Sequence, residues 1–129
     1  MALVSVVVAL ALIQFFWFGM QVGRARVRFG IPAPATSGNP DFERVFRVHM
    51  NTLEQLVMFL PSIWIFASYV SPIWAAGLGV VYLVGRFVYA QGYAKAANKR
   101  GLGFGLSALP VMILLFGGLV GAALSLSRR

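Results

Sequence analysis

The sequence of 129 residues contains no cysteine, one histidine and three acidic residues. Without cysteine, the chain has no disulfide, no thiolate nucleophile and no Cys-ligated metal. A single histidine, His49, argues against a metal site made by protein groups alone. We therefore expect no metal cofactor, and nothing in the sequence implies an organic prosthetic group.

Charged residues are also scarce, at 11% of the chain, whereas 60% of the residues are hydrophobic. An average soluble domain has roughly 25% charged residues, so water is not the main solvent of this protein. A helix that spans a bilayer needs about 20 mostly apolar residues, and four such spans would occupy most of the chain. The composition predicts a single integral membrane domain over residues 1–129.

Four apolar stretches predict four spanning helices, and turn-forming residues separate them. The expected spans cover approximately residues 3–22, 46–69, 73–93 and 104–126. The segment 23–41 is rich in proline and glycine and predicts a loop. Ser71 and Pro72 predict a tight connection, and Gly101 and Gly103 predict a turn. The expected fold class is therefore all-α, an integral membrane four-helix bundle. In the last span, the spacing of Gly117 and Gly121 is typical of close helix contact.

The net charge of +8 would also fit a nucleic-acid-binding protein if position were ignored. Most basic residues, however, lie in or beside the two connections that follow the first and third predicted spans: Arg24, Arg26, Arg28, Arg44 and Arg47 at the first, and Lys95, Lys99 and Arg100 at the second. Basic residues accumulate in the cytoplasmic loops of membrane proteins and also attract anionic lipid. We therefore expect both loops on the cytoplasmic side, both termini on the other side, membrane lipids as partners, and no nucleic acid.

Polar residues follow one side of the predicted helix 46–69. Arg47, Asn51 and Glu54 are separated by four and three residues, so they share one face. A charged group that faces lipid costs several kcal/mol, so this face should point into the bundle, a subunit interface or a wet cavity. A salt-bridge network that only fixes helix packing is an equally open interpretation.

The predicted helix 73–93 carries a second polar face, made by Tyr82, Arg86, Tyr89 and Tyr93 at intervals of four, three and four residues. Arg100 falls at nearly the same azimuth as the last three. Taken singly, Tyr82 is typical of an interfacial aromatic belt. Because the two helices are antiparallel, Glu54 and Arg86 lie at similar depth, and we expect them to form an ion pair.

Together, the two faces would place guanidinium groups, a carboxylate, an amide and phenols at the cytoplasmic membrane boundary. This set suits a small zwitterion with two carboxylates, because arginine binds carboxylates through two hydrogen bonds. Glutathione has this charge pattern, and a nearby guanidinium would lower the pKa of its thiol. His49 is better explained as a structural histidine than as a proton-transfer group, since no acid–base partner is evident.

Two segments resemble a known family. Residues 43–54 read E-R-V-F-R-V-H-M-N-T-L-E, which resembles the E-R-x-x-R-x-x-x-N-x-x-E signature of the MAPEG family, membrane-associated proteins of eicosanoid and glutathione metabolism. Residues 86–93 read R-F-V-Y-A-Q-G-Y and are followed by Arg100. This pattern is similar to the R-x-x-Y-x-x-G-Y…R segment of the microsomal glutathione transferase and leukotriene-forming synthase branch. The resemblance covers essentially the whole chain.

The resemblance implies a homotrimer that binds glutathione between adjacent subunits near the cytoplasmic face. It implies that Arg100 is the catalytic residue that stabilises the thiolate. The implied glutathione contacts are Arg26, Arg47, Asn51, Glu54, Tyr89 and Tyr93, with Arg86 as a structural or binding arginine. His49 and Gln55 belong to the same set of positions but depart from the leukotriene-forming branch, which has Gln and Tyr there. Leukotriene synthesis specifically is therefore not predicted.

The function implied is a detoxifying glutathione S-transferase that conjugates glutathione to lipophilic electrophiles from the bilayer. A peroxidase reaction on lipid hydroperoxides could use the same thiolate. The alternative is a non-enzymatic lipid-binding or scaffold protein of the same fold. The presence of Arg100 argues against this alternative. A small multidrug transporter is a third possibility, but Glu54 has arginines on matching faces and no second free carboxylate to couple proton transport.

Overall fold

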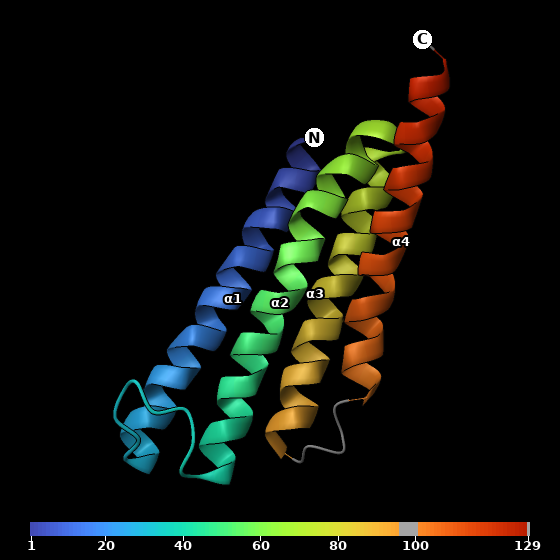
Figure 1. Ribbon diagram of the computed structural model, residues 1–129. Coiled ribbons are helices and arrows are strands. Elements are labelled where there is room, and N and C mark those ends of the chain that lie inside the picture. The colour runs from blue at the N-terminus through green and yellow to red at the C-terminus, as the bar shows by residue number, and fades with distance from the viewer. Residues whose placement is uncertain (96–100, 129) are drawn as a thin grey trace.

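The computed structural model describes residues 1–95 and 101–128 and contains four helices within them: α1 (Ala2–Phe29), α2 (Pro40–Tyr69), α3 (Pro72–Lys95) and α4 (Gly101–Ser127). The helices run side by side, and α2 packs against all three others (Figure 1). The start of α1 and the end of α4 lie at one end of the bundle, and the α1–α2 connection, the end of α3 and the start of α4 lie at the other. We call these the terminal end and the loop end. The predicted all-α four-helix bundle is confirmed.

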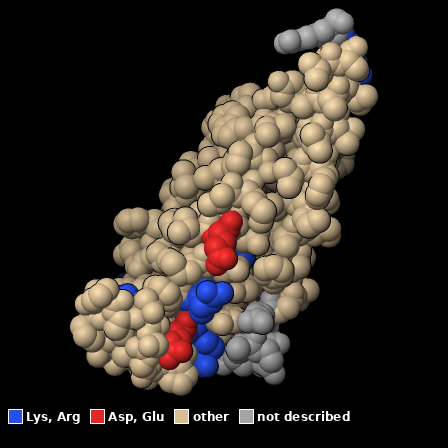
Figure 2. Space-filling model, in the orientation of Figure 1, with Lys and Arg blue, Asp and Glu red and all other residues tan. Residues whose placement is uncertain are grey.

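The outer surface of the bundle is largely apolar. Large hydrophobic side chains are exposed on every helix, among them Phe16, Trp17, Met58, Trp74, Met112 and Phe116. Within the described residues, α1, α3 and α4 are long and apolar enough to cross a membrane, whereas the first half of α2 is too polar to meet the same measure. Figure 2 shows the charged side chains gathered mainly toward the loop end of an otherwise uncharged face. The chain is an integral membrane protein.

Helix α1 is longer than the sequence predicted. The loop expected from residue 23 is wrong for residues 23–29, which continue the helix to Phe29. Gly23 lies in open space and crowds nothing, and the arginines that follow it are good helix formers. Those in the last turn also offset the negative end of the helix dipole. The helix ends at Gly30, whose φ of 68° is left-handed and whose N–H donates to the Arg26 carbonyl.

Helix α2 likewise begins earlier than the predicted span. Pro40 occupies the first turn, where its missing N–H costs nothing. The Asn39 side chain accepts hydrogen bonds from the N–H groups of Asp41 and Phe42, at 2.9 and 3.1 Å. This cap fixes where the polar first half of α2 emerges from the loop.

Glycines bring α4 close to its neighbours at both ends. At the terminal end, a Cβ atom on Gly117 would lie 2.8 Å from the Phe66 ring of α2, and one on Gly121 would lie 2.7 Å from Val70. The predicted close contact through this pair is confirmed. At the loop end, Gly101 and Gly103 begin α4 and do not form the expected turn. A Cβ atom on Gly103 would overlap the backbone of Tyr89, so only glycine permits this approach of α3 and α4.

Candidate functional site

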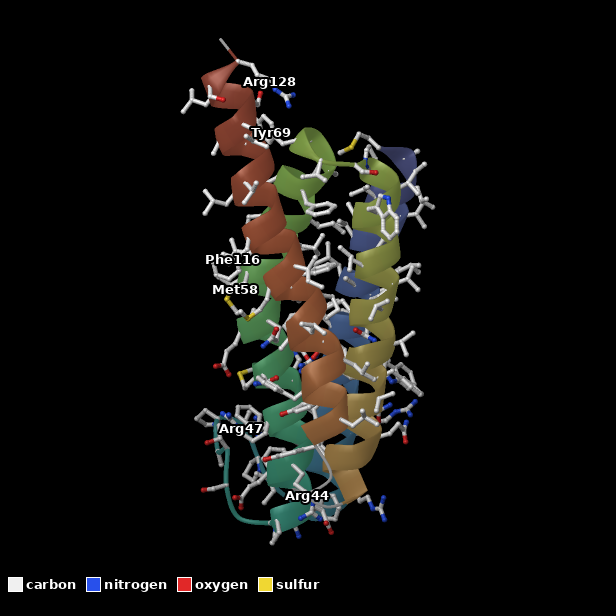
Figure 3. All side chains as sticks on the ribbon, turned by 90° about the vertical axis from the view of Figure 1, so that its right-hand side faces the viewer. Arg44, Arg47, Met58, Tyr69, Phe116 and Arg128 are labelled. Carbon is white, nitrogen blue, oxygen red and sulfur yellow. The ribbon has the colours of Figure 1, made fainter. Side chains whose placement is uncertain are left out.

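A cavity of about 350 Å³ lies between α2, α3 and α4 at the loop end, and we call it the α2–α4 cavity. Its lining residues are Arg47, Asn51, Tyr89, Tyr93, Gly101 and Phe104. The first four belong to the glutathione-binding set predicted from the sequence. Figure 3 places Arg47 at the loop end, far from Tyr69 and Arg128. The structure thus brings together residues of the two polar faces that helical spacing predicted on α2 and α3.

The aromatic wall of the cavity comes from α3. The Tyr89 and Tyr93 rings stack with centroids 5.5 Å apart and planes 12° apart, and both side chains are buried. Tyr89 also contacts Phe104 of α4 and lies over the Arg86 guanidinium, whose carbon is 4.4 Å from the ring centroid. A cation over the face of tyrosine is an attractive contact. Tyr89 is therefore held between the cavity and a buried positive charge.

Arg86 is completely buried and ties three helices together beneath the cavity. Its guanidinium donates to the Thr52 hydroxyl of α2 at 2.8 Å and to the Ser107 hydroxyl of α4 at 3.2 Å. Each hydroxyl also contacts a carbonyl of its own helix, Thr52 at 2.7 Å from Val48 and Ser107 at 3.0 Å from Phe104. These bonds give partners to two of the three guanidinium nitrogens, whereas the buried Nε has none among the described residues.

The predicted ion pair between Glu54 and Arg86 is wrong. Among the described residues, Arg86 has no carboxylate partner, and Glu54 is exposed. The two side chains are on different sides of α2. Glu54 lies two residues, or about 200° around the helix axis, from Thr52. Depth along the two helices was matched correctly, but Thr52 is the residue of α2 that faces Arg86.

Thr52 and Ser107 were not among the predicted site residues. Ser107 could have been noticed, because it is an isolated hydroxyl early in the otherwise apolar α4. Hydroxyls inside membrane helices commonly bond across to a neighbouring helix. Thr52 follows Asn51 directly, and its position alone gave no comparable signal.

The remaining predicted site residues lie elsewhere. His49 stacks on Phe15 of α1 at 4.6 Å between ring centroids, and Arg26 donates to the Ala35 carbonyl at 2.7 Å and lies over the Phe42 ring. Gln55 is buried, and its carbonyl oxygen has no partner in the described part of the chain. Arg100 lies outside the described residues. The structure therefore gathers four of the predicted ligands and separates Arg26 and His49 from them.

Comparison with protein families matches residues 3–120 to the MAPEG family. The chain belongs to this family. The resemblance predicted from the two motifs is confirmed.

This MAPEG protein is similar to several known chains. It is 52% identical over 116 residues to an uncharacterized protein of Synechocystis sp., covering 90% of this chain and 85% of the relative. It is 39% identical over 121 residues to microsomal glutathione S-transferase 2 of Homo sapiens, covering 94% and 82%. It is also 39% identical over 99 residues to leukotriene C4 synthase of Rattus norvegicus, covering 77% and 66%.

The α2–α4 cavity of this MAPEG protein combines a guanidinium, an amide and two tyrosines with Gly101 and Phe104. A guanidinium can bind a carboxylate through two hydrogen bonds, and an amide can both donate and accept. Within residues 1–95 and 101–128, no three His, Asp or Glu side chains gather in the manner of a metal site. The cavity is suited to a small polar molecule with negatively charged groups.

Proposed function

We propose that this MAPEG protein is a membrane-bound glutathione S-transferase that conjugates glutathione to lipophilic electrophiles. The observation that carries the proposal is the convergence of Arg47, Asn51, Tyr89 and Tyr93 on one cavity at the loop end. The similarity to a microsomal glutathione S-transferase and to a leukotriene C4 synthase supports the same chemistry. Peptide recognition then comes from the cavity, and the electrophile reaches it from the bilayer.

In the proposed reaction, Arg47 and Asn51 hold charged and polar groups of the glutathione peptide. The Arg100 guanidinium lowers the pKa of the thiol, whose proton passes to water. The thiolate then forms a bond from sulfur to carbon of the electrophile, while the leaving group or the opened ring oxygen takes the displaced electron pair. Gly101, the neighbour of Arg100 in the sequence, lines the cavity, which supports this role for Arg100.

We further propose that the functional unit is a homotrimer. The predicted ligands fall on two surfaces of one subunit, with Arg47 in the α2–α4 cavity and Arg26 and His49 on the side of α1. A neighbouring copy could bring its own Arg26 and His49 to the cavity of the first, because a head-to-tail interface of a ring joins two different surfaces. Glutathione would then lie between adjacent subunits, as the family resemblance implies.

Mixed oligomers test this arrangement directly. At a glutathione concentration well below the wild-type KM, Arg26→Ala and Arg47→Ala proteins should each have little activity alone. Co-expressed in equal amounts, they should regain about a quarter of the wild-type rate, because random assembly places both intact residues at about that share of sites. A mixture no more active than the separate variants would contradict a shared site. A detergent-corrected mass near that of one 14.0 kDa chain, in active protein, would contradict the trimer itself.

The activity is tested with purified protein, glutathione and a lipophilic electrophile, with the conjugate detected by mass spectrometry. We expect enzyme-dependent conjugate formation that saturates with glutathione. Binding of glutathione without conjugation of any electrophile would favour the non-enzymatic alternative.

We also propose that the loop end faces the cytoplasm, since most basic residues lie there. The cysteine-free chain allows single-cysteine labelling without further changes. Ser127→Cys, near the C-terminus, should react with a membrane-impermeant maleimide in intact cells. Ser37→Cys, in the α1–α2 loop, should react only after permeabilisation; the reverse pattern would invert the assigned orientation.

A further inference from the structure

A second cavity, of about 330 Å³, lies between α1, α2 and α3 at the loop end, and we call it the α1–α3 cavity. Its walls include Trp17, Phe18, Gln21, Val48, Phe87 and Gln91. None of the residues that line it lines the α2–α4 cavity. The proposed glutathione transferase activity therefore leaves this second cavity without a role.

The α1–α3 cavity is amphipathic. Trp17 and Phe87 flank it and are 46% and 55% exposed, on helices whose outer surfaces face lipid. Gln21 and Gln91 contribute two side-chain amides, and neither makes a hydrogen bond within the described part of the chain. An apolar wall that opens to the bilayer, with amides that have no hydrogen-bond partner among residues 1–95 and 101–128, suits a ligand with both an apolar and a polar part.

Positive charge lies at the loop side of this cavity. The Arg24 guanidinium lies over the Trp17 ring, 5.7 Å from its centroid. Arg44 precedes Val48 by four residues and so lies one turn nearer the loop on the same face of α2. Its Nε is buried without a partner among the described residues, while another nitrogen of the same guanidinium pairs with Asp41. The polar part of a ligand here would therefore meet cations.

We propose that the α1–α3 cavity binds an anionic phospholipid from the bilayer. The phosphate lies at the rim formed by Arg24 and Arg44 and accepts hydrogen bonds from Gln21 and Gln91, and the beginning of an acyl chain lies along Trp17 and Phe87. The volume is at the small end of the range for ligand pockets, so it takes the headgroup and the adjacent carbons, not a whole lipid. Basic pockets between spanning helices at the cytoplasmic side are a recognised form of lipid site.

The lipid is favoured over a free anion because of where the apolar wall lies. Trp17 and Phe87 are on the outer side of the cavity, and an anion without an apolar chain would leave them without a partner. Amphipathic aromatic residues such as tryptophan also prefer the level of the headgroups. The charge and the aromatic wall therefore match the two parts of one lipid molecule.

Tryptophan quenching can report on this site alone. Replacing Trp64 and Trp74 with Phe leaves Trp17 as the sole tryptophan of the chain. This full-length variant is reconstituted in phosphatidylcholine vesicles that contain dibrominated phosphatidylglycerol or dibrominated phosphatidylcholine. We expect the phosphatidylglycerol to quench Trp17 at a several-fold lower mole fraction. Arg24→Gln should raise that mole fraction about fivefold, whereas Arg28→Gln, which removes the same charge from an exposed position of α1, should not.

Filling the cavity gives a second, independent test. Ala90 lines the cavity, and Ala90→Phe would place a large side chain in it without changing any charge. This variant should lose the preference for phosphatidylglycerol while keeping its thermal stability and its binding of glutathione. Equal quenching by the two brominated lipids, or an equal loss in Arg28→Gln, would overturn the proposal. If millimolar inorganic phosphate removed the preference for phosphatidylglycerol, the cavity would be a site for a free anion, and the proposal would be overturned as well.

Discussion

The two ends of the bundle use the same packing device for different purposes. At the terminal end, Gly117 and Gly121 bring α4 against apolar side chains of α2. At the loop end, Gly103 brings α4 against the backbone of Tyr89, but there the close contact encloses Arg86 and borders the α2–α4 cavity. Close packing at the terminal end joins only apolar surfaces. At the loop end it positions polar groups.

This difference predicts where substitutions should affect stability and where they should affect ligand binding. The close contacts of α4 at the terminal end are with large apolar groups and lie away from the α2–α4 cavity, so changes there should alter the free energy of unfolding alone. Changes at the loop end should also alter glutathione binding or chemistry, because the cavity wall and the helix contacts share residues such as Tyr89.

The largest expected effect belongs to Arg100→Ala at the loop end. Loss of the guanidinium should return the pKa of the bound thiol toward its ordinary value and lower the conjugation rate at neutral pH about 10- to 1,000-fold, with partial rescue at alkaline pH. Glutathione affinity should change little. Thiolate absorbance during a pH titration measures the effect, and Arg128→Ala at the terminal end is the matched control. An unchanged thiol pKa in folded Arg100→Ala would remove this residue from the mechanism.

A smaller effect is expected from Arg47→Ala, which removes a charged ligand from the cavity. The KM for glutathione should rise about 10- to 100-fold with kcat nearly constant, because a charged hydrogen bond contributes about 1.5–3 kcal/mol in both thiol and thiolate complexes. Glu54→Gln should also raise KM, but less, since Glu54 is exposed and does not line the cavity. Steady-state kinetics measures the KM for glutathione in each variant. A wild-type KM in either folded variant would show that the replaced residue is not a ligand.

Glycine substitutions compare the two ends directly. Gly103→Ala should destabilise the protein by about 1–3 kcal/mol and raise KM several-fold, because α3 and α4 must separate at the cavity. Gly121→Ala should lower stability without changing KM. Gly105→Ala, where a Cβ atom meets nothing within 4 Å, is the control for helix propensity. Thermal unfolding and kinetics on the same preparations test this, and an equal change of KM in Gly103→Ala and Gly121→Ala would contradict the separation of roles.

The smallest effect is expected from Ser107→Ala, which removes one of the two hydroxyl partners of Arg86. Thr52 still accepts from the guanidinium and the lost bond is long, at 3.2 Å, so stability should fall by about 1.5 kcal/mol, the low end for a hydrogen bond to a charged group, with no change in KM. Ser125→Ala, near the terminal end, should change stability by less than about 0.5 kcal/mol. Indistinguishable unfolding temperatures for the two variants would show that the Ser107 bond contributes nothing measurable.

Much of this arrangement could be predicted from the sequence, because helical periodicity determines which residues share a face. The spacing of Arg47 and Asn51, and of Tyr89 and Tyr93, placed the cavity residues correctly. Hydrophobicity likewise predicted four helices and their order. The end of α1 could not be predicted in the same way, since Gly23 and the arginines after it are compatible with either loop or helix, and Gly30 is the residue that stops the helix.

The partners of Arg86 and the position of His49 were beyond prediction for a different reason. Both depend on the rotation of α2 relative to its neighbours. That rotation is set by the sum of all helix contacts and by no local pattern. It directs Thr52 toward Arg86, turns Glu54 outward and stacks His49 on Phe15. The separation of His49 from the cavity follows from spacing, because His49 lies two residues, or about 200°, from both Arg47 and Asn51.

Calorimetry of the purified, detergent-solubilised protein with glutathione and with its desthiol analogue is the most direct test of the α2–α4 cavity as a glutathione site. Both ligands should bind the wild-type protein with Kd values within about tenfold of each other, because the cavity recognises the peptide's charged groups and not sulfur alone. Arg47→Ala should weaken both to a similar extent. Failure of the folded wild-type protein to bind either ligand, or wild-type affinity in Arg47→Ala, would contradict the assignment.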